Sequence, residues 1–217
     1  MWKSALALIL VASLLSLPIG ARAGDDEAAV LASTAGAVEQ DGDHFVIHLK
    51  SGKIKLYGCP PKTDCSAVWL DAYDRAGRVF VFHLSDGDID EYSLVDDRTG
   101  ATTYLDRAPS FSPTGDVAVE LVYGENIASF NQRPAINIWR RSGGKFKREW
   151  SRPIVAEGDY TVVGWLSNDR VDIKAVIPTG WTGRERITAG RGTKIISVIR
   201  KAKGWRVVSK KVVPEWE

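Results

Sequence analysis

The chain has 217 residues, with 29 Lys and Arg, 27 Asp and Glu and 3 His, which gives a formal net charge of +2 at pH 7. Because this balance lacks the basic excess of nucleic-acid-binding proteins, we expect no nucleic-acid partner. The charge is unevenly distributed: residues 24–130 hold 8 basic and 19 acidic residues, and residues 131–217 hold 19 basic and 8 acidic residues. Either the C-terminal half meets an anionic partner, or the two halves attract each other within one domain.

The first 23 residues have the pattern of a signal peptide. Lys3 precedes the apolar segment 5–17, which is too short to span a bilayer, and Ala21 and Ala23 form a small-x-small cleavage site. We therefore expect a mature chain that starts at Gly24, carries no transmembrane segment and is periplasmic or secreted. Residues 24–43 are Ala-rich and acidic without alternation, which predicts a linker or a short helix.

Residues 44–217 are predicted to form a single β domain. Hairpin patterns with Gly-containing turns recur at 44–57, 90–105, 136–150 and 195–210, and the last three are preceded by two-part strand patterns at 68–84, 110–123 and 162–176. These patterns predict three four-stranded units, 66–106, 108–151 and 161–212, and a half unit at 44–57. Trp69 and Trp165 fall at matching positions of the first strand, where we expect them to pack between units.

The predicted fold class is all-β, a β-propeller-like array of about three and a half four-stranded antiparallel units. A twisted β-meander or a sandwich built from the same units is the alternative. No strand is expected after Lys211 to close a ring of units.

Three segments resemble the blade signature of the periplasmic propellers of the Tol system and of the broader WD-repeat-like group. They are FSPTGDVAVE (111–120) followed by INIWRR (136–141), and VDDRTG (95–100) before them. The chain as a whole is similar to uncharacterised exported bacterial proteins with such blades. This resemblance implies a β-propeller-like fold and binding rather than catalysis.

Cys59 and Cys65 are the only cysteines. In an oxidising compartment we expect them to pair, and because the closed loop is short the bond is a local clamp. A zinc site would require two more soft ligands, and His44 and His48 are too far apart along a strand to bind one ion together.

The long connections between predicted strands are residues 58–65, 123–135, 151–160 and 177–193, and the strand order places all of them on one face. Long loops at one end of a rigid scaffold are common binding sites. The candidate ligand- or partner-binding residues there are Tyr123, Phe130, Arg133, Trp181, Arg184, Arg186 and Arg191. Aromatic rings and guanidinium groups suit a sugar, a carboxylate or a phosphate-bearing envelope component. The alternative is that Trp181 packs under its own loop and the arginines are solvated.

Asp86, Asp88 and Asp90 are a weak candidate site for Ca²⁺, with Asp97 at the position of the last ligand of an EF-hand. Glu91 replaces the required glycine, so the aspartates would instead share a solvated strand face. We expect no other cofactor. Motifs for nucleophilic, metallo- or phosphate chemistry are lacking, and a hydrolase built on Glu157 and Asp159 is the remaining catalytic reading.

The function that these patterns favour is an exported, non-catalytic interaction module acting through the long-loop face on an envelope protein or a glycan. The first alternative is a protein that binds a glycan or a small anionic ligand, and the second is a carboxylate-based hydrolase.

Overall fold

The computed structural model describes residues 26–60, 65–87, 90–122, 134–154, 158–178, 191–209 and 213–214. Over these ranges the chain is all-β, with one short helix and sixteen strands in four antiparallel sheets. This confirms the fold class that the alternating apolar runs and their turns predict. No helix in the described ranges is long and apolar enough to cross a membrane.

Each sheet is built from strands that follow one another in the sequence. Helix α1 (Asp26–Ser33) precedes sheet A, which contains β1 (Val38–Asp41), β2 (His44–His48) and β3 (Ile54–Tyr57). Sheet B contains β4 (Ala67–Asp74), β5 (Val79–Ser85), β6 (Asp90–Asp96) and β7 (Thr102–Leu105). Sheet C contains β8 (Pro109–Phe111), β9 (Val117–Val122), β10 (Ala135–Ser142) and β11 (Lys145–Pro153). Sheet D contains β12 (Asp159–Ser167), β13 (Arg170–Pro178), β14 (Arg191–Lys201), β15 (Gly204–Ser209) and β16 (Val213–Pro214).

Sheets B, C and D correspond to the three predicted units, but sheet A has one strand more than the predicted half unit. Residues 24–43, expected as a linker or a short helix, contain both α1 and β1. Strand β1 pairs antiparallel with β2, from Val38 opposite Ile47 to Asp41 opposite His44. Only its first residue is buried, so β1 lacks the apolar alternation by which strands are predicted.

Neighbouring sheets pack face to face around three apolar clusters. One joins sheets A and B, a second joins B and C, and a third joins C and D. Sheets B and C are therefore covered on both faces, which explains why β5 and β9 are buried along almost their whole lengths instead of alternating.

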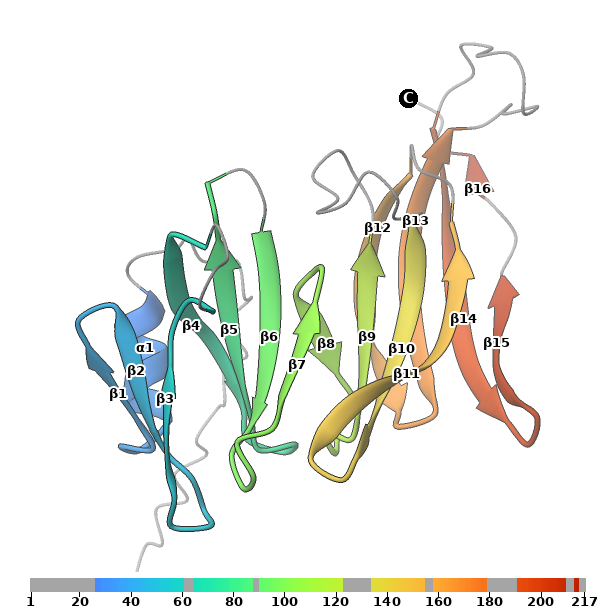
Figure 1. The fold of residues 1–217 in the computed structure, drawn as a ribbon. Coiled ribbons are helices and arrows are strands. Elements are labelled where there is room, and N and C mark those ends of the chain that lie inside the picture. The colour runs from blue at the N-terminus through green and yellow to red at the C-terminus, as the bar shows by residue number, and fades with distance from the viewer. Residues whose placement is uncertain are drawn as a thin grey trace, which may run out of the picture.

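The four sheets form an open row. Figure 1 shows sheet A (blue) and sheet D (orange to red) at opposite ends of this row. A short strand, β16, follows Lys211, but as the sequence predicts it does not close a ring of units. Strand β16 pairs with Gly192 and Thr193 of β14, so it extends sheet D and does not join sheet A.

The two ends of the strands differ in the connections that they carry. The turns between the first and second and between the third and fourth strands of sheets B, C and D lie at one end, together with the turn between β2 and β3 (Figure 1). We call this the short-turn end. The connections that follow β3, β5, β9, β11 and β13 leave from the opposite end, which we call the loop end.

The two tryptophans that the sequence aligns do not occupy equivalent positions. Trp165 lies near the short-turn end of β12, packs against the core between sheets C and D, and donates to the Ser110 carbonyl at 3.2 Å. Trp69 lies near the loop end of β4 and is 36% exposed. The expected inter-sheet packing is therefore correct for Trp165 and wrong for Trp69. Trp69 is five residues before the last residue of β4 and Trp165 is two residues before the last residue of β12, so the two stand at different distances from the turn.

Candidate functional site

Most of the binding residues that the sequence predicts for the loop end lie outside the described residues. These are Tyr123, Phe130, Arg133, Trp181, Arg184 and Arg186. Arg191 is the first residue of β14, where its backbone pairs with Pro178. The structure does describe the strand ends that carry these connections: Val122 pairs with Ala135, and Ile177 pairs with Gly192. The connections between β9 and β10 and between β13 and β14 therefore leave and re-enter their sheets at neighbouring positions of the loop end.

The predicted disulfide is confirmed at this end of the molecule. Cys59 and Cys65 are bonded, with their Cα atoms 5.5 Å apart. Cys59 follows β3 of sheet A, and Cys65 precedes β4 of sheet B. Directly after it, the Ser66 amide donates to the Ser85 carbonyl at 2.8 Å. The disulfide therefore constrains the connection between sheet A and sheet B.

Removing the disulfide should have a modest effect on stability. The double change Cys59→Ala and Cys65→Ala is expected to lower the free energy of unfolding by about 2 kcal/mol, because the closed loop is short. Urea unfolding followed by circular dichroism measures this, and the wild-type protein under reducing conditions should unfold at the midpoint of the double variant. Equal stability of the oxidised and reduced proteins would contradict a clamping role.

Three ring side chains form a row across sheet B at the loop end. Trp69 on β4, His83 on β5 and Tyr92 on β6 stand directly opposite one another in the strand register. The Trp69 and His83 rings have centroids 5.1 Å apart, and the His83 and Tyr92 rings stack at 4.8 Å with 9° between their planes. Cross-strand ring pairs of this kind stabilise a sheet and hold each other in place. We call these three residues the aromatic row.

Carboxylates surround the aromatic row. Nε2 of His83 lies 2.9 Å from Oδ1 of Asp90, and this contact fixes the orientation of the imidazole. The pKa of the Tyr92 hydroxyl is raised, first by burial and then by the charges of Asp71 and Asp90, although Arg107 opposes the shift. The loop end of sheet B therefore presents carboxylates around the exposed ring of Trp69.

A small hollow of about 280 Å³ lies between β4 of sheet B and β8 of sheet C. Asp71, whose charge acts on Tyr92, lines it together with Ala72, Tyr73, Asp74, Val81, Pro109 and Phe111. Burial raises the pKa of the Asp74 carboxyl, although the Gly77 amide donates to it at 2.7 Å. The hollow thus extends from Asp71, near the aromatic row, to Asp74, at the short-turn end of β4.

The Ca²⁺ site suggested by Asp86, Asp88 and Asp90 stays a prediction, because Asp88 lies outside the described residues. Asp90 is in contact with His83, and Asp97, which the pattern placed as a further ligand, is 2% exposed and accepts hydrogen bonds from Tyr73 and Arg78. Among the described side chains, no group of three or more His, Cys, Asp and Glu is arranged to hold a metal ion. Of the two carboxylates suggested for hydrolysis, Asp159 begins β12 and is exposed, and Glu157 is not described.

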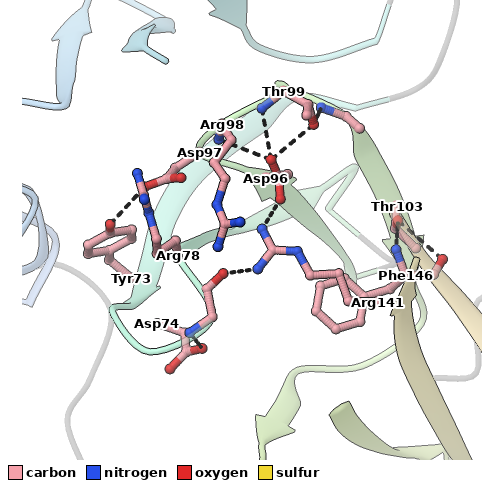
Figure 2. Close-up of polar contacts among 12 residues, drawn as sticks. Tyr73, Asp74, Arg78, Asp96, Asp97, Arg98, Thr99, Thr103, Arg141 and Phe146 are labelled. Atoms are coloured by element: carbon pink, nitrogen blue, oxygen red, sulfur yellow. Dashed lines mark hydrogen bonds and ion pairs between the residues drawn. The ribbon is translucent and has the colours of Figure 1, made fainter. Parts of the chain in front are cut away.

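The short-turn end contains a buried polar cluster that joins sheets B and C (Figure 2). Asp96 caps the turn after β6: its Oδ1 accepts from the amides of Arg98 and Thr99 at 3.0 and 2.8 Å and from the Thr99 hydroxyl at 2.9 Å. Its Oδ2 pairs with Arg141 of β10, which also donates to the Gly77 carbonyl. The Asp96 and Arg141 side chains are 2% and 9% exposed, so this ion pair lies in the interior.

Two glycines allow the turns of sheets B and C to meet beneath Arg141. A Cβ atom on Gly115, whose φ is +69°, would lie 2.1 Å from the Gly77 Cα. Only glycine permits such a close backbone approach at this conformation. Asp96 and Arg141 are thus engaged in holding sheets B and C together.

A second buried carboxylate, Glu120 of β9, is fully enclosed, with 0% of its surface exposed. Its Oε1 accepts from the amides of Asp106 and Arg107 at 2.7 and 3.1 Å, in the connection between sheets B and C. Its Oε2 accepts from Asn137 Nδ2 and Trp139 Nε1, both at 2.9 Å. Four donors compensate for the loss of water around this charge, as a buried carboxylate requires.

Sheets C and D are joined by Glu149 of β11. It accepts from Arg140 Nε at 2.8 Å and from Trp205 Nε1 at 2.9 Å. Burial alone would raise the pKa of Glu149, but the hydrogen bonds from Trp205 and Arg140 and the nearby charge of Arg200 outweigh it and lower the pKa. This group therefore stays ionised and anchored in the folded protein.

Comparisons with known proteins give little beyond the fold. No protein-family model matches the chain, and no curated protein matches it. Among solved structures, the chain is similar to the N-terminal domain of Nup159, with 13% sequence identity and a TM-score of 0.34. The similarity covers 80% of this chain and 47% of that chain, so this chain spans about half the length of that structure. The fold assignment therefore rests on the four sheets themselves.

Proposed function

We propose that this chain is an exported, non-catalytic interaction module that binds its partner at the loop end. The contrast between the two ends supports this function most. At the short-turn end the charged side chains of Asp96, Asp97 and Arg141 are engaged in internal contacts. At the loop end Trp69 stays 36% exposed, although it is fixed by His83 on a rigid sheet. A fixed, exposed tryptophan is the kind of residue that contributes most to protein binding.

Export is supported by the disulfide, because such bonds persist in oxidising compartments and are rare in the cytosol. The signal peptide expected over residues 1–23 would direct the chain out of the cytoplasm. The resemblance of 95–100 and 111–120 to Tol-type blades favours a partner in the bacterial envelope, and we propose an envelope protein first.

A glycan is the second candidate partner, and the surroundings of Trp69 favour it. A sugar ring can stack on the exposed indole while its hydroxyl groups donate to the carboxylates of Asp71 and Asp90 nearby. The arginines at 184, 186 and 191 would favour an anionic ligand, and this role stays a prediction.

The test is to place a photo-crosslinking amino acid at position 69 and, as a control, at Lys145, the exposed first residue of β11. Position 69 should yield a defined adduct in exporting cells, and position 145 should not. Trp69→Ala should weaken binding of the captured partner at least tenfold, as expected for loss of a central aromatic contact. An adduct sensitive to glycosidases would favour the glycan. Equal labelling from both positions, or none from position 69, would refute binding at the aromatic row.

A further inference from the structure

The two terminal sheets each leave one face exposed. In sheet A, side chains that alternate with the buried ones point away from sheet B. Ile54 and Leu56 of this face are 63% and 71% exposed, with Val46 opposite Leu56. Glu39 and Asp41 of β1 lie on the same face. We call this surface, made of Glu39, Asp41, Val46, Ile54 and Leu56, the A-face.

Sheet D has a comparable face on the side away from sheet C. The strand register gives two rows across β13, β14 and β15. In the first row Ile199 stands between Arg170 and Arg206, and in the next row Ser197 stands between Asp172 and Val208. Lys174 pairs with Ile195 on the same face. Val208 is 43% exposed. We call this surface, made of Arg170, Lys174, Ile195, Ile199, Arg206 and Val208, the D-face.

The two faces are complementary. Both have β-branched or leucine side chains among charged ones, which is the composition of an interface core with a charged rim. The described positions on this side of sheet A carry two carboxylates, His44 and His48, and neither Lys nor Arg; Nε2 of His48 lies 3.4 Å from Oε1 of Glu39. The D-face carries three basic side chains. Two carboxylates lie on the same side of sheet D: Asp172 accepts from Arg170 and from Ser197, the latter at 2.7 Å, and Asp159 stands opposite Val176 at the loop end. The whole chain repeats this pattern, since its first half is acidic and its second half basic.

We propose that a second copy of this chain covers these faces, with the D-face of one copy packed on the A-face of the other. The sheets within one chain already pack face to face in this way, so the contact continues the row with the same geometry. Charge decides the pairing: two A-faces would bring carboxylates together and two D-faces would bring basic groups together, whereas A on D pairs opposite charges. Two copies joined in this way at both ends form a closed dimer of eight sheets.

The first test is the oligomeric state of the mature protein by size-exclusion chromatography with light scattering. We expect a dimer that dissociates as salt is raised, because salt screens the charged rim. Leu56→Asp on the A-face and Val208→Asp on the D-face should each give a monomer with an unchanged circular dichroism spectrum, because both side chains are exposed. Tyr104→Asp is the matched control: Tyr104 is 50% exposed on β7 but lies on neither terminal sheet, so this variant should stay dimeric.

The second test separates head-to-tail pairing from other arrangements. The Leu56→Asp protein keeps its D-face, and the Val208→Asp protein keeps its A-face. Mixed together, two monomeric variants should form a heterodimer through one intact contact. Wild-type protein that is monomeric at all concentrations, dimers that survive both substitutions, or variants that fail to associate on mixing would overturn the proposal. Binding at the aromatic row is measured separately with the monomeric variants, so failure of one proposal does not decide the other.

Discussion

Arg141→Met is expected to lower the free energy of unfolding by about 3–5 kcal/mol. The side chain of Arg141 is 9% exposed and pairs with Asp96, which is 2% exposed. Its loss leaves an uncompensated negative charge in the interior, and it also removes the donor to the Gly77 carbonyl. The penalty is larger than the net value of the pair itself, because a buried charge without a partner costs more than an absent pair. Urea unfolding of the variant and of the wild type measures it.

Two further variants make this result interpretable. Arg152→Met changes an exposed arginine in the neighbouring strand β11 and should alter stability by less than about 0.5 kcal/mol. Asp96→Asn keeps an oxygen for the Thr99 and Arg98 amides but removes the charge, so adding it to Arg141→Met should cost less than the sum of the two single changes. Strict additivity would mean that the two side chains do not interact.

Glu120→Gln is expected to cost about 3 kcal/mol, although it changes a single atom in a strand. Every hydrogen bond of Glu120 is an acceptor bond, from two backbone amides, Asn137 and Trp139. In glutamine, an NH₂ group replaces one of the two carboxylate oxygens. Because each oxygen of Glu120 accepts from two donors, this NH₂ group would face two donors in either orientation of the amide. We expect a lower unfolding midpoint and a change in Trp139 fluorescence. Glu91→Gln, on the exposed side of β6, is the control and should be nearly neutral.

The sequence predicts the units of this fold well because their signals are local. Gly turns and apolar runs fall within single hairpins, and sheets B, C and D follow them closely. Strand β1 was missed because its pairing with β2 leaves only Val38 buried. Trp69 was placed wrongly because the two tryptophans stand at different distances from the turn: Trp69 is five residues before the last residue of β4, and Trp165 is two residues before the last residue of β12.

The polar groups that join the sheets were not predicted, and the reason is physical. A carboxylate such as Glu120 within a strand is usually solvated, and its burial depends on donors from positions up to 19 residues away in sequence. Likewise, the aromatic row brings Trp69, His83 and Tyr92 together only through strand register. Pairs of oppositely placed ring residues in adjacent predicted strands are the signal that would have identified this row. The loop residues at 123–133 and 179–190 remain predictions of the sequence alone.

Each junction between sheets uses its own residues. Sheets A and B meet through the Lys50 amide and the Asp97 carbonyl at 2.8 Å, sheets B and C through Arg141 and Glu120, and sheets C and D through Glu149 and Trp205. The repeated units are therefore not interchangeable parts. A chain in which the segments for sheets B and C exchanged places would keep every strand and lose every junction. The divergence among these repeats thus encodes the order in which they assemble.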